Sequence, residues 1–94
     1  MANAYKFILN EKIKDSANIL KVLFSMALKE TELIYGKAKV KLETNYKLND
    51  ARGICLIESG TDCGEHLAKL LSGFLIRELG DNSFKVERIK TENK

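Results

Sequence analysis

Residues 37–58 read KAKVKLETNYKLNDARGICLIE, and this stretch decides the predicted fold. Over residues 37–48, apolar side chains alternate with charged and polar ones, and a period of two predicts a half-buried strand. Residues 49–53 contain the Asn, Asp and Gly that favour a turn. The apolar run at residues 53–58 predicts the next strand. Because the connection is short, we expect these two strands to form a hairpin.

The predicted hairpin is flanked along the chain by two predicted helices and two further strands. One helix begins at Asp15 or Ser16, which can cap it, and ends at Gly36. The other begins at a capping box that starts at Asp62, carries leucines at helical spacing, and ends at Gly80. Strands are predicted at residues 4–9 and 84–89. The order β-α-β-β-α-β is that of ferredoxin-like domains, so we expect an α+β fold with a four-stranded, mainly antiparallel sheet and two helices.

The composition fits one small domain over residues 1–94, with a frayed end from about residue 91. The chain is 45% hydrophobic and 31% charged, with a net charge of +3. No apolar run is long enough to span a membrane, and no secretory signal is visible. Two cysteines in such a chain favour reduced thiols and a cytoplasmic location.

Two predicted surfaces carry more apolar side chains than are needed for two helices to pack on one face of a sheet. The first helix is apolar around most of its circumference, including Val22 and Met26. In the strand at residues 53–58, Ile54 and Leu56 face one side and Cys55 and Ile57 the other. If the helices cover Ile54 and Leu56, then Cys55 and Ile57 lie on the open face of the sheet. We therefore expect a homodimer that uses Val22, Met26, Cys55 and Ile57.

The densest group of reactive residue types is the stretch TDCGEH at residues 61–66. The start of a helix lowers the pKa of a thiol such as Cys63, and His66 lies one turn further on. No third group is available to complete a catalytic site, so a structural role is favoured over a thiol-dependent enzyme. Cys55, Cys63 and His66 give at most three ligands, fewer than a zinc site needs, so no metal site is predicted.

Four lysines lie on one face of the predicted strand at residues 37–48, namely Lys37, Lys39, Lys41 and Lys47. Lysines along a strand can follow the phosphates of a nucleic acid. They also keep an edge strand soluble and unpaired, and we favour this second interpretation because the net charge is low.

The chain has two family resemblances. The element order and the pair Arg52-Gly53 are similar to the RNA recognition motif, although Ile54, Leu56 and Ser59 stand where that family has aromatic residues. The last 40 residues or so resemble the 4-vinyl reductase (TRAPP-related) domain, through Cys63, Gly73-Phe74-Leu75, Leu79-Gly80 and Val86-Glu87. This second resemblance implies a small-molecule-binding or dimerising domain, with a site near Cys63, Gly73 and Glu87. We add His66 to these predicted ligand-binding residues, because it lies one helical turn after Cys63.

The sequence thus predicts a non-enzymatic binding or assembly module that forms a homodimer and takes a small-molecule ligand. The alternative is a nucleic-acid-binding protein that uses the lysine-bearing strand. Whether the chain is an enzyme stays open, and so does the identity of any cofactor. No partnership with a membrane is expected.

Overall fold

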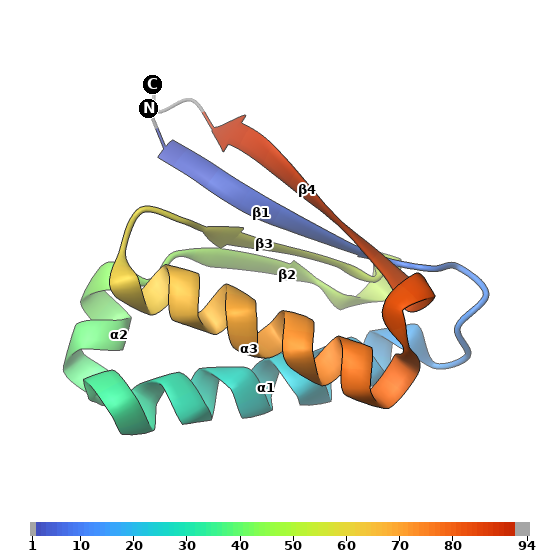
Figure 1. Cartoon of the computed structure of the whole chain (residues 1–94), viewed down its shortest axis with the longest axis horizontal. Helices are drawn as coiled ribbons and strands as arrows, with labels where there is room; N and C mark the ends of the chain where they lie inside the picture. Colours follow the sequence, from blue (N-terminus) through green and yellow to red (C-terminus); the bar gives the residue numbers. More distant parts are fainter. Residues whose placement is uncertain (1, 92–94) are drawn as a thin grey trace.

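The computed structural model describes residues 2–91 and contains one open antiparallel sheet of four strands. The strands are β1 (Ala2–Leu9), β2 (Tyr46–Asn49), β3 (Ile54–Glu58) and β4 (Phe84–Thr91). Their spatial order is β2-β3-β1-β4, so β1 and β3 are central and β2 and β4 form the edges (Figure 1). Phe7 lies opposite Cys55 on one side and Val86 on the other, which fixes the register of the three longer strands.

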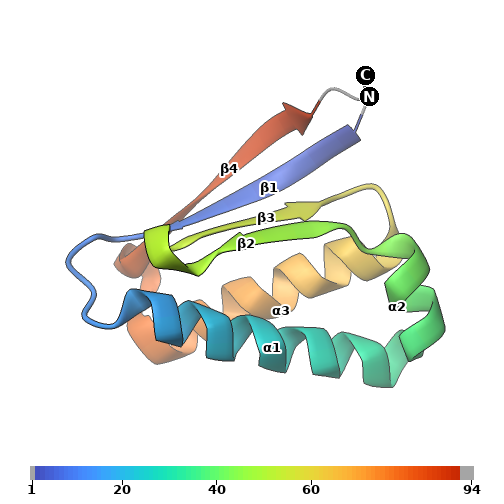
Figure 2. The same cartoon turned by 180° about the vertical axis from the view of Figure 1, so that it is seen from behind.

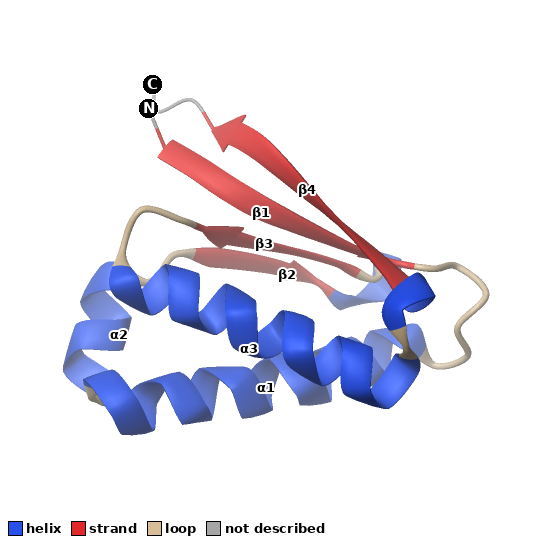
Figure 3. Cartoon of the chain, in the orientation of Figure 1, coloured by secondary structure: helices blue, strands red, loops and turns tan. Residues whose placement is uncertain are grey.

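Three α-helices cover one face of this sheet, and they form a single layer with α1 beside α3 (Figures 2 and 3). They are α1 (Ser16–Tyr35), α2 (Lys37–Glu43) and α3 (Asp62–Leu79). Two 3₁₀ turns, η1 (Asp50–Arg52) and η2 (Asp81–Ser83), precede β3 and β4. Within residues 2–91, no helix combines the length and the apolar character needed to cross a membrane.

The core lies between the helix layer and the sheet. Its fully buried side chains come from β1, β3, α1 and α3, namely Phe7, Leu20, Cys55, Ile57, Leu67, Leu71 and Leu75. Leucines at positions 67, 71 and 75 recur every four residues, which places them on one side of α3. The prediction of an amphipathic helix at this position is therefore confirmed.

The predicted start of α3 was one residue too late. Thr61, not Asp62, is the capping residue, and its Oγ1 accepts a hydrogen bond from the Gly64 N–H at 3.0 Å. The same hydroxyl donates to the Glu43 carbonyl oxygen at 3.0 Å, which ties the start of α3 to the end of α2. Asp62 is the first helical residue, where its charge favours the helix N-terminus.

The prediction of one strand over residues 37–48 was wrong, because its first part is helix α2 and only Tyr46–Asn49 is a strand. Of the alternating apolar residues, Val40 is buried, whereas Ala38 and Leu42 are exposed. Lys, Ala, Leu and Glu are strong helix formers, and this local preference overrides a period-two pattern that the fold does not bury. Residues 2–91 therefore form three α-helices where two were expected.

The coarser prediction of an α+β fold with a four-stranded antiparallel sheet is confirmed. The assignment of residues 1–94 to a single domain stays a prediction. The frayed end, expected from about residue 91, falls mainly on residues 92–94, which lie outside the described residues.

Candidate functional site

The sheet face turned away from the helices is covered by none of the described elements (Figure 1). Side chains alternate between the two faces along each strand, and residues directly opposite each other share a face. Phe7 is fully buried under the helices, so its neighbours Lys6 and Ile8 point to the open face. Opposite them on β3 are Leu56 and Ile54, both half-buried.

This arrangement corrects the predicted faces of β3. Cys55 and Ile57 are fully buried beneath the helices, and Ile54 and Leu56 are the residues on the open face. The reason is the register, because Phe7 of β1 lies opposite Cys55 and its large ring needs the cover of the helix layer. Cys55 and Ile57 cannot form the predicted dimer interface.

A groove of about 690 Å³ runs over the open face between β1, β3 and the hairpin that carries η1. Its lining residues are Lys6, Lys47, Leu48, Asn49, Arg52, Ile54 and Leu56. Three of these side chains are cationic and none is acidic, and Ile54 and Leu56 supply apolar surface between the cations. Its described lining therefore combines three cations with apolar surface, and the Glu87 carboxylate lies opposite Lys6 on β4, outside that lining.

Arg52 reaches this groove because the chain turns sharply at Gly53. Gly53 has a φ of 67°, a left-handed conformation that favours glycine, and its carbonyl oxygen accepts a hydrogen bond from the Leu9 N–H at 2.8 Å. An added Cβ at Gly53 would lie 3.3 Å from the Leu9 Cβ. The turn is thus held against the end of β1, and it fixes the backbone beside Arg52.

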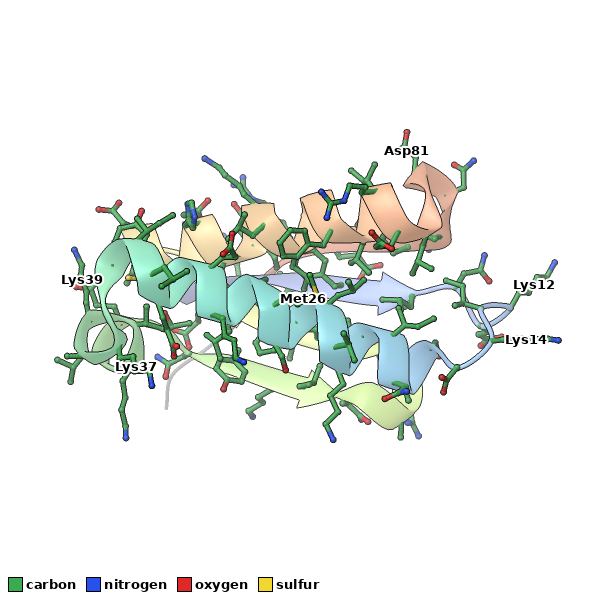
Figure 4. The ribbon with its side chains drawn as sticks, turned by 90° about the horizontal axis from the view of Figure 1, so that it is seen from below. Lys12, Lys14, Met26, Lys37, Lys39 and Asp81 are labelled. Atoms are coloured by element: carbon green, nitrogen blue, oxygen red, sulfur yellow. The ribbon has the colours of Figure 1, made fainter. Side chains whose placement is uncertain are left out.

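The four predicted nucleic-acid contacts do not share a strand face. Lys37, Lys39 and Lys41 lie on helix α2, and only Lys47 lines the groove. Lys39 instead places its Nζ 5.4 Å from the centre of the Tyr35 ring. Figure 4 shows Lys37 and Lys39 together at one end of the helix layer.

Lys6 was not predicted as a site residue, although the signal was present in the sequence. Lys6 stands between Tyr5 and Phe7, and a strand that buries its aromatic residues must turn the lysine between them to the opposite face. The sequence distinguishes Arg52 only as part of the Arg52-Gly53 pair. Its approach to Lys6 and Lys47 depends on strand order, which alternation alone does not reveal.

Cys63 does not have the activated thiol that a helix start can give. The side chain is fully buried, and this burial raises the pKa of the thiol, as does the nearby Glu43 carboxylate. Both effects oppose the helix dipole, so the expected lowering of the pKa was wrong. A thiol that is buried and protonated is a poor nucleophile.

His66 lies beside Tyr35 and not in a catalytic arrangement. The two rings meet edge to face, with their centres 5.6 Å apart. The Nε2 atom of His66 is buried and has no hydrogen-bond partner among the described residues. Among the side chains that the structure describes, no three from His, Cys, Asp or Glu gather closely enough to hold a metal ion.

The residues predicted from the 4-vinyl reductase resemblance are not brought together. Cys63 is in the core, and Gly73 lies on an exposed part of α3. Glu87 is opposite Lys6 on β4 and therefore points to the other side of the sheet from α3. No single ligand of modest size can contact these positions together.

Of the predicted dimer residues, the two on α1 are exposed. Val22 and Met26 expose 51% and 41% of their surface. Together with polar neighbours, they line a depression of about 350 Å³ on the outer side of the helix layer, where Met26 is labelled in Figure 4. Their role in association stays a prediction.

Comparison with known proteins found no match of this chain to a family model, a curated protein or a solved structure. The resemblances to the RNA recognition motif and to the 4-vinyl reductase domain therefore rest on the residues quoted for them.

Proposed function

We propose that the chain is a non-enzymatic binding module of ferredoxin-like arrangement that takes an anionic small molecule on its open sheet face. The strand order β2-β3-β1-β4, with all helices on the opposite face, supports the architectural part of this proposal. The buried Cys63 thiol, with its raised pKa, supports a role other than thiol catalysis.

The observation that carries the proposal is the composition of the groove. Lys6, Lys47 and Arg52 enter it from β1, β2 and η1, three separate elements. No described lining residue is acidic, and these cations attract a carboxylate, phosphate or sulfonate group. Ile54 and Leu56 between them favour a ligand that also has an apolar part. A volume of about 690 Å³ is within the range of small-molecule sites.

The proposal can be tested with 8-anilinonaphthalene-1-sulfonate, a fluorescent probe that combines an anionic group with an apolar body. We expect saturable binding that weakens as salt is added, because salt screens the attraction. Replacing Lys6, Lys47 and Arg52 together by Gln should reduce the affinity at least about tenfold, given what charged hydrogen bonds contribute.

A matched control carries Gln at Lys12, Lys14 and Lys37. These lysines are exposed and lie at the two ends of the molecule in Figure 4, outside the groove lining. The control has the same net charge as the groove variant and should keep wild-type affinity. Equal losses in both variants would show that only net charge matters and would contradict the proposed site.

Single-stranded nucleic acid is a second candidate ligand, favoured by one specific observation. Lys47, Lys6 and Lys85 come from β2, β1 and β4 and point to the same open face. A chain that crosses the sheet therefore meets a cation on three of the four strands, with Leu56 of β3 between Lys47 and Lys6. Fluorescence anisotropy with a labelled ten-nucleotide oligonucleotide tests this candidate. Binding at low salt that the groove variant abolishes would support it, and no binding at low salt would remove it.

A further inference from the structure

Strand β4 is an eight-residue edge strand whose outer side is left open by the described residues (Figures 1 and 2). An open edge presents backbone N–H and C=O groups that can pair with another strand. Third along this edge, Val86 exposes 43% of its surface although it is on the helix side of the sheet. The edge is therefore long, and its first half carries an exposed apolar side chain between Lys85 and Glu87.

Helix α3 carries a second unpartnered feature on the same side of the molecule. Gly73 lies inside the helix, where glycine is unfavourable, and a Cβ added there would meet nothing within 4 Å. Nearby Ile76 exposes 46% of its surface. At 100° per residue, both lie next to Lys69 and Ser72, which line a hollow of about 280 Å³ together with Val86. The exposed stripe of α3 thus runs beside β4.

We infer that two copies of this chain associate through β4, edge to edge and antiparallel, about a two-fold axis that passes through Val86. The two sheets then form one continuous sheet of eight strands, with both helix layers on the same side. This interface leaves the groove over β2 and β3 uncovered and does not depend on what the groove binds.

The order of charges along β4 selects this register. With Val86 on the axis, Val86 faces its own copy, and Lys85 faces Glu87 of the partner subunit on the open side of the sheet, twice by symmetry. Phe84 faces Arg88 of the partner subunit on the helix side. Within its own chain the Arg88 guanidinium lies 5.4 Å from the centre of the Tyr5 ring and donates to the Tyr5 hydroxyl at 3.2 Å, so its charge stays on this side of the sheet.

Other registers are disfavoured by like charges. An axis through Lys85, Glu87, Arg88 or Lys90 brings that residue against its own copy. An axis through Ile89 brings Arg88 against Lys90 twice. Charges on an edge strand commonly prevent pairing. Of the two-fold axes through residues 85–90, only the axis through Val86 avoids contacts between like charges. We therefore expect these charges to oppose pairing of β4 with an unrelated strand and to permit pairing with a second copy of the chain.

The α3 helices explain why a glycine is placed at position 73. Once the sheets join, the two copies of α3 lie on either side of the axis on the same face. Gly73 lets the helix backbones approach closely, and Ile76 becomes covered. Both features have no partner among the described residues of a single chain.

Sedimentation velocity with charge-reversal variants tests this inference. We expect the wild-type chain to dimerise with rising concentration. Lys85→Glu places a second carboxylate against Glu87 of the partner subunit, and Glu87→Lys places two lysines together. Each variant should therefore raise the dimer dissociation constant about tenfold or more. An equimolar mixture of the two variants should form a heterodimer, because each of its two cross-strand sites then pairs one carboxylate with one ammonium group.

Two controls carry the same changes of charge outside the paired segment. Lys90→Glu matches the first variant and Glu30→Lys, on α1, matches the second. Both controls should keep wild-type dimerisation. A wild-type chain that stays monomeric at millimolar concentration would overturn the inference. So would a dimer that the β4 variants leave unchanged, or variants that fail to associate when mixed although each is folded by circular dichroism.

Discussion

Two glycines on helix α3 have opposite surroundings, and alanine should therefore have opposite effects at them. Gly64 is buried where α3 meets the end of β3. A Cβ added there would overlap the Glu58 carbonyl oxygen and lie 3.1 Å from Thr61 Oγ1, the atom that caps the helix. At Gly73, the same Cβ would enter open space.

The magnitudes follow from these contacts. Overpacking against a backbone oxygen costs about 1–3 kcal/mol, and disturbing the Thr61 cap adds about 1 kcal/mol. The better helix propensity of alanine offsets about 1 kcal/mol of this loss in the free energy of unfolding. We expect Gly64→Ala to lower the free energy of unfolding by about 1–3 kcal/mol and the Tm by at least about 4 °C. Gly73→Ala should raise the free energy of unfolding by up to about 1 kcal/mol.

Urea denaturation followed by circular dichroism checks both values, at protein concentrations low enough to keep the chain monomeric. At high concentration, the proposed dimer predicts a further difference, because the new methyl group at position 73 would separate the two α3 helices. Gly73→Ala should then stabilise the monomer and weaken the dimer. If Gly64→Ala is as stable as the wild type, or if Gly73→Ala destabilises the monomer, the reasoning from these contacts is refuted.

Three further predictions concern side chains that the structure places in specific contacts. Burial raises the pKa of Cys55 from 9.0 to about 12, so its contribution to stability should be complete below pH 9 and fall as the pH rises toward 12; Cys55→Ala should flatten this part of the stability curve measured by urea denaturation. Cys63 should react with iodoacetamide at neutral pH only slowly, at a rate that denaturant increases, because its thiol is buried and protonated; rapid stoichiometric labelling of the native chain would contradict this. The Tyr5 hydroxyl donates to Glu65 at 3.0 Å, so Tyr5→Phe should cost about 1 kcal/mol in thermal unfolding, and less when it is combined with Glu65→Gln.

The parts of the fold that the sequence predicts well are those where local pattern and burial agree. The leucine spacing of α3 and the glycines that end α1 and α3 mark real boundaries. The strand prediction failed at residues 37–43. Alternation of Lys with Ala, Val and Leu is typical of a strand, but the helix preference of the same residues makes this segment a helix. Alternation predicts burial only when another element packs against the apolar side chains. Of the apolar residues in this segment, only Val40 is buried.

The candidate site was harder to predict because it depends on strand order. The two faces of β3 are chemically similar in sequence, with Ile54 and Leu56 on one and Cys55 and Ile57 on the other. Only the register with β1, where Phe7 faces Cys55, decides which pair is covered. Lys6 and Arg52 join Lys47 through the same long-range pairing, which no local pattern encodes.

The pairing of β1 with β4 also orders events during synthesis of the chain. β1 is made first and can pair with β3 as soon as residue 58 has emerged, but its other edge waits for β4, with Ala2 finally opposite Thr91. Closing so long a stretch of chain is slow compared with forming a helix. Until then, a nascent chain has β1 as its open edge, and it lacks the β4 edge at which we infer that two copies pair. On that inference, two chains can associate through β4 only after this strand has docked on β1.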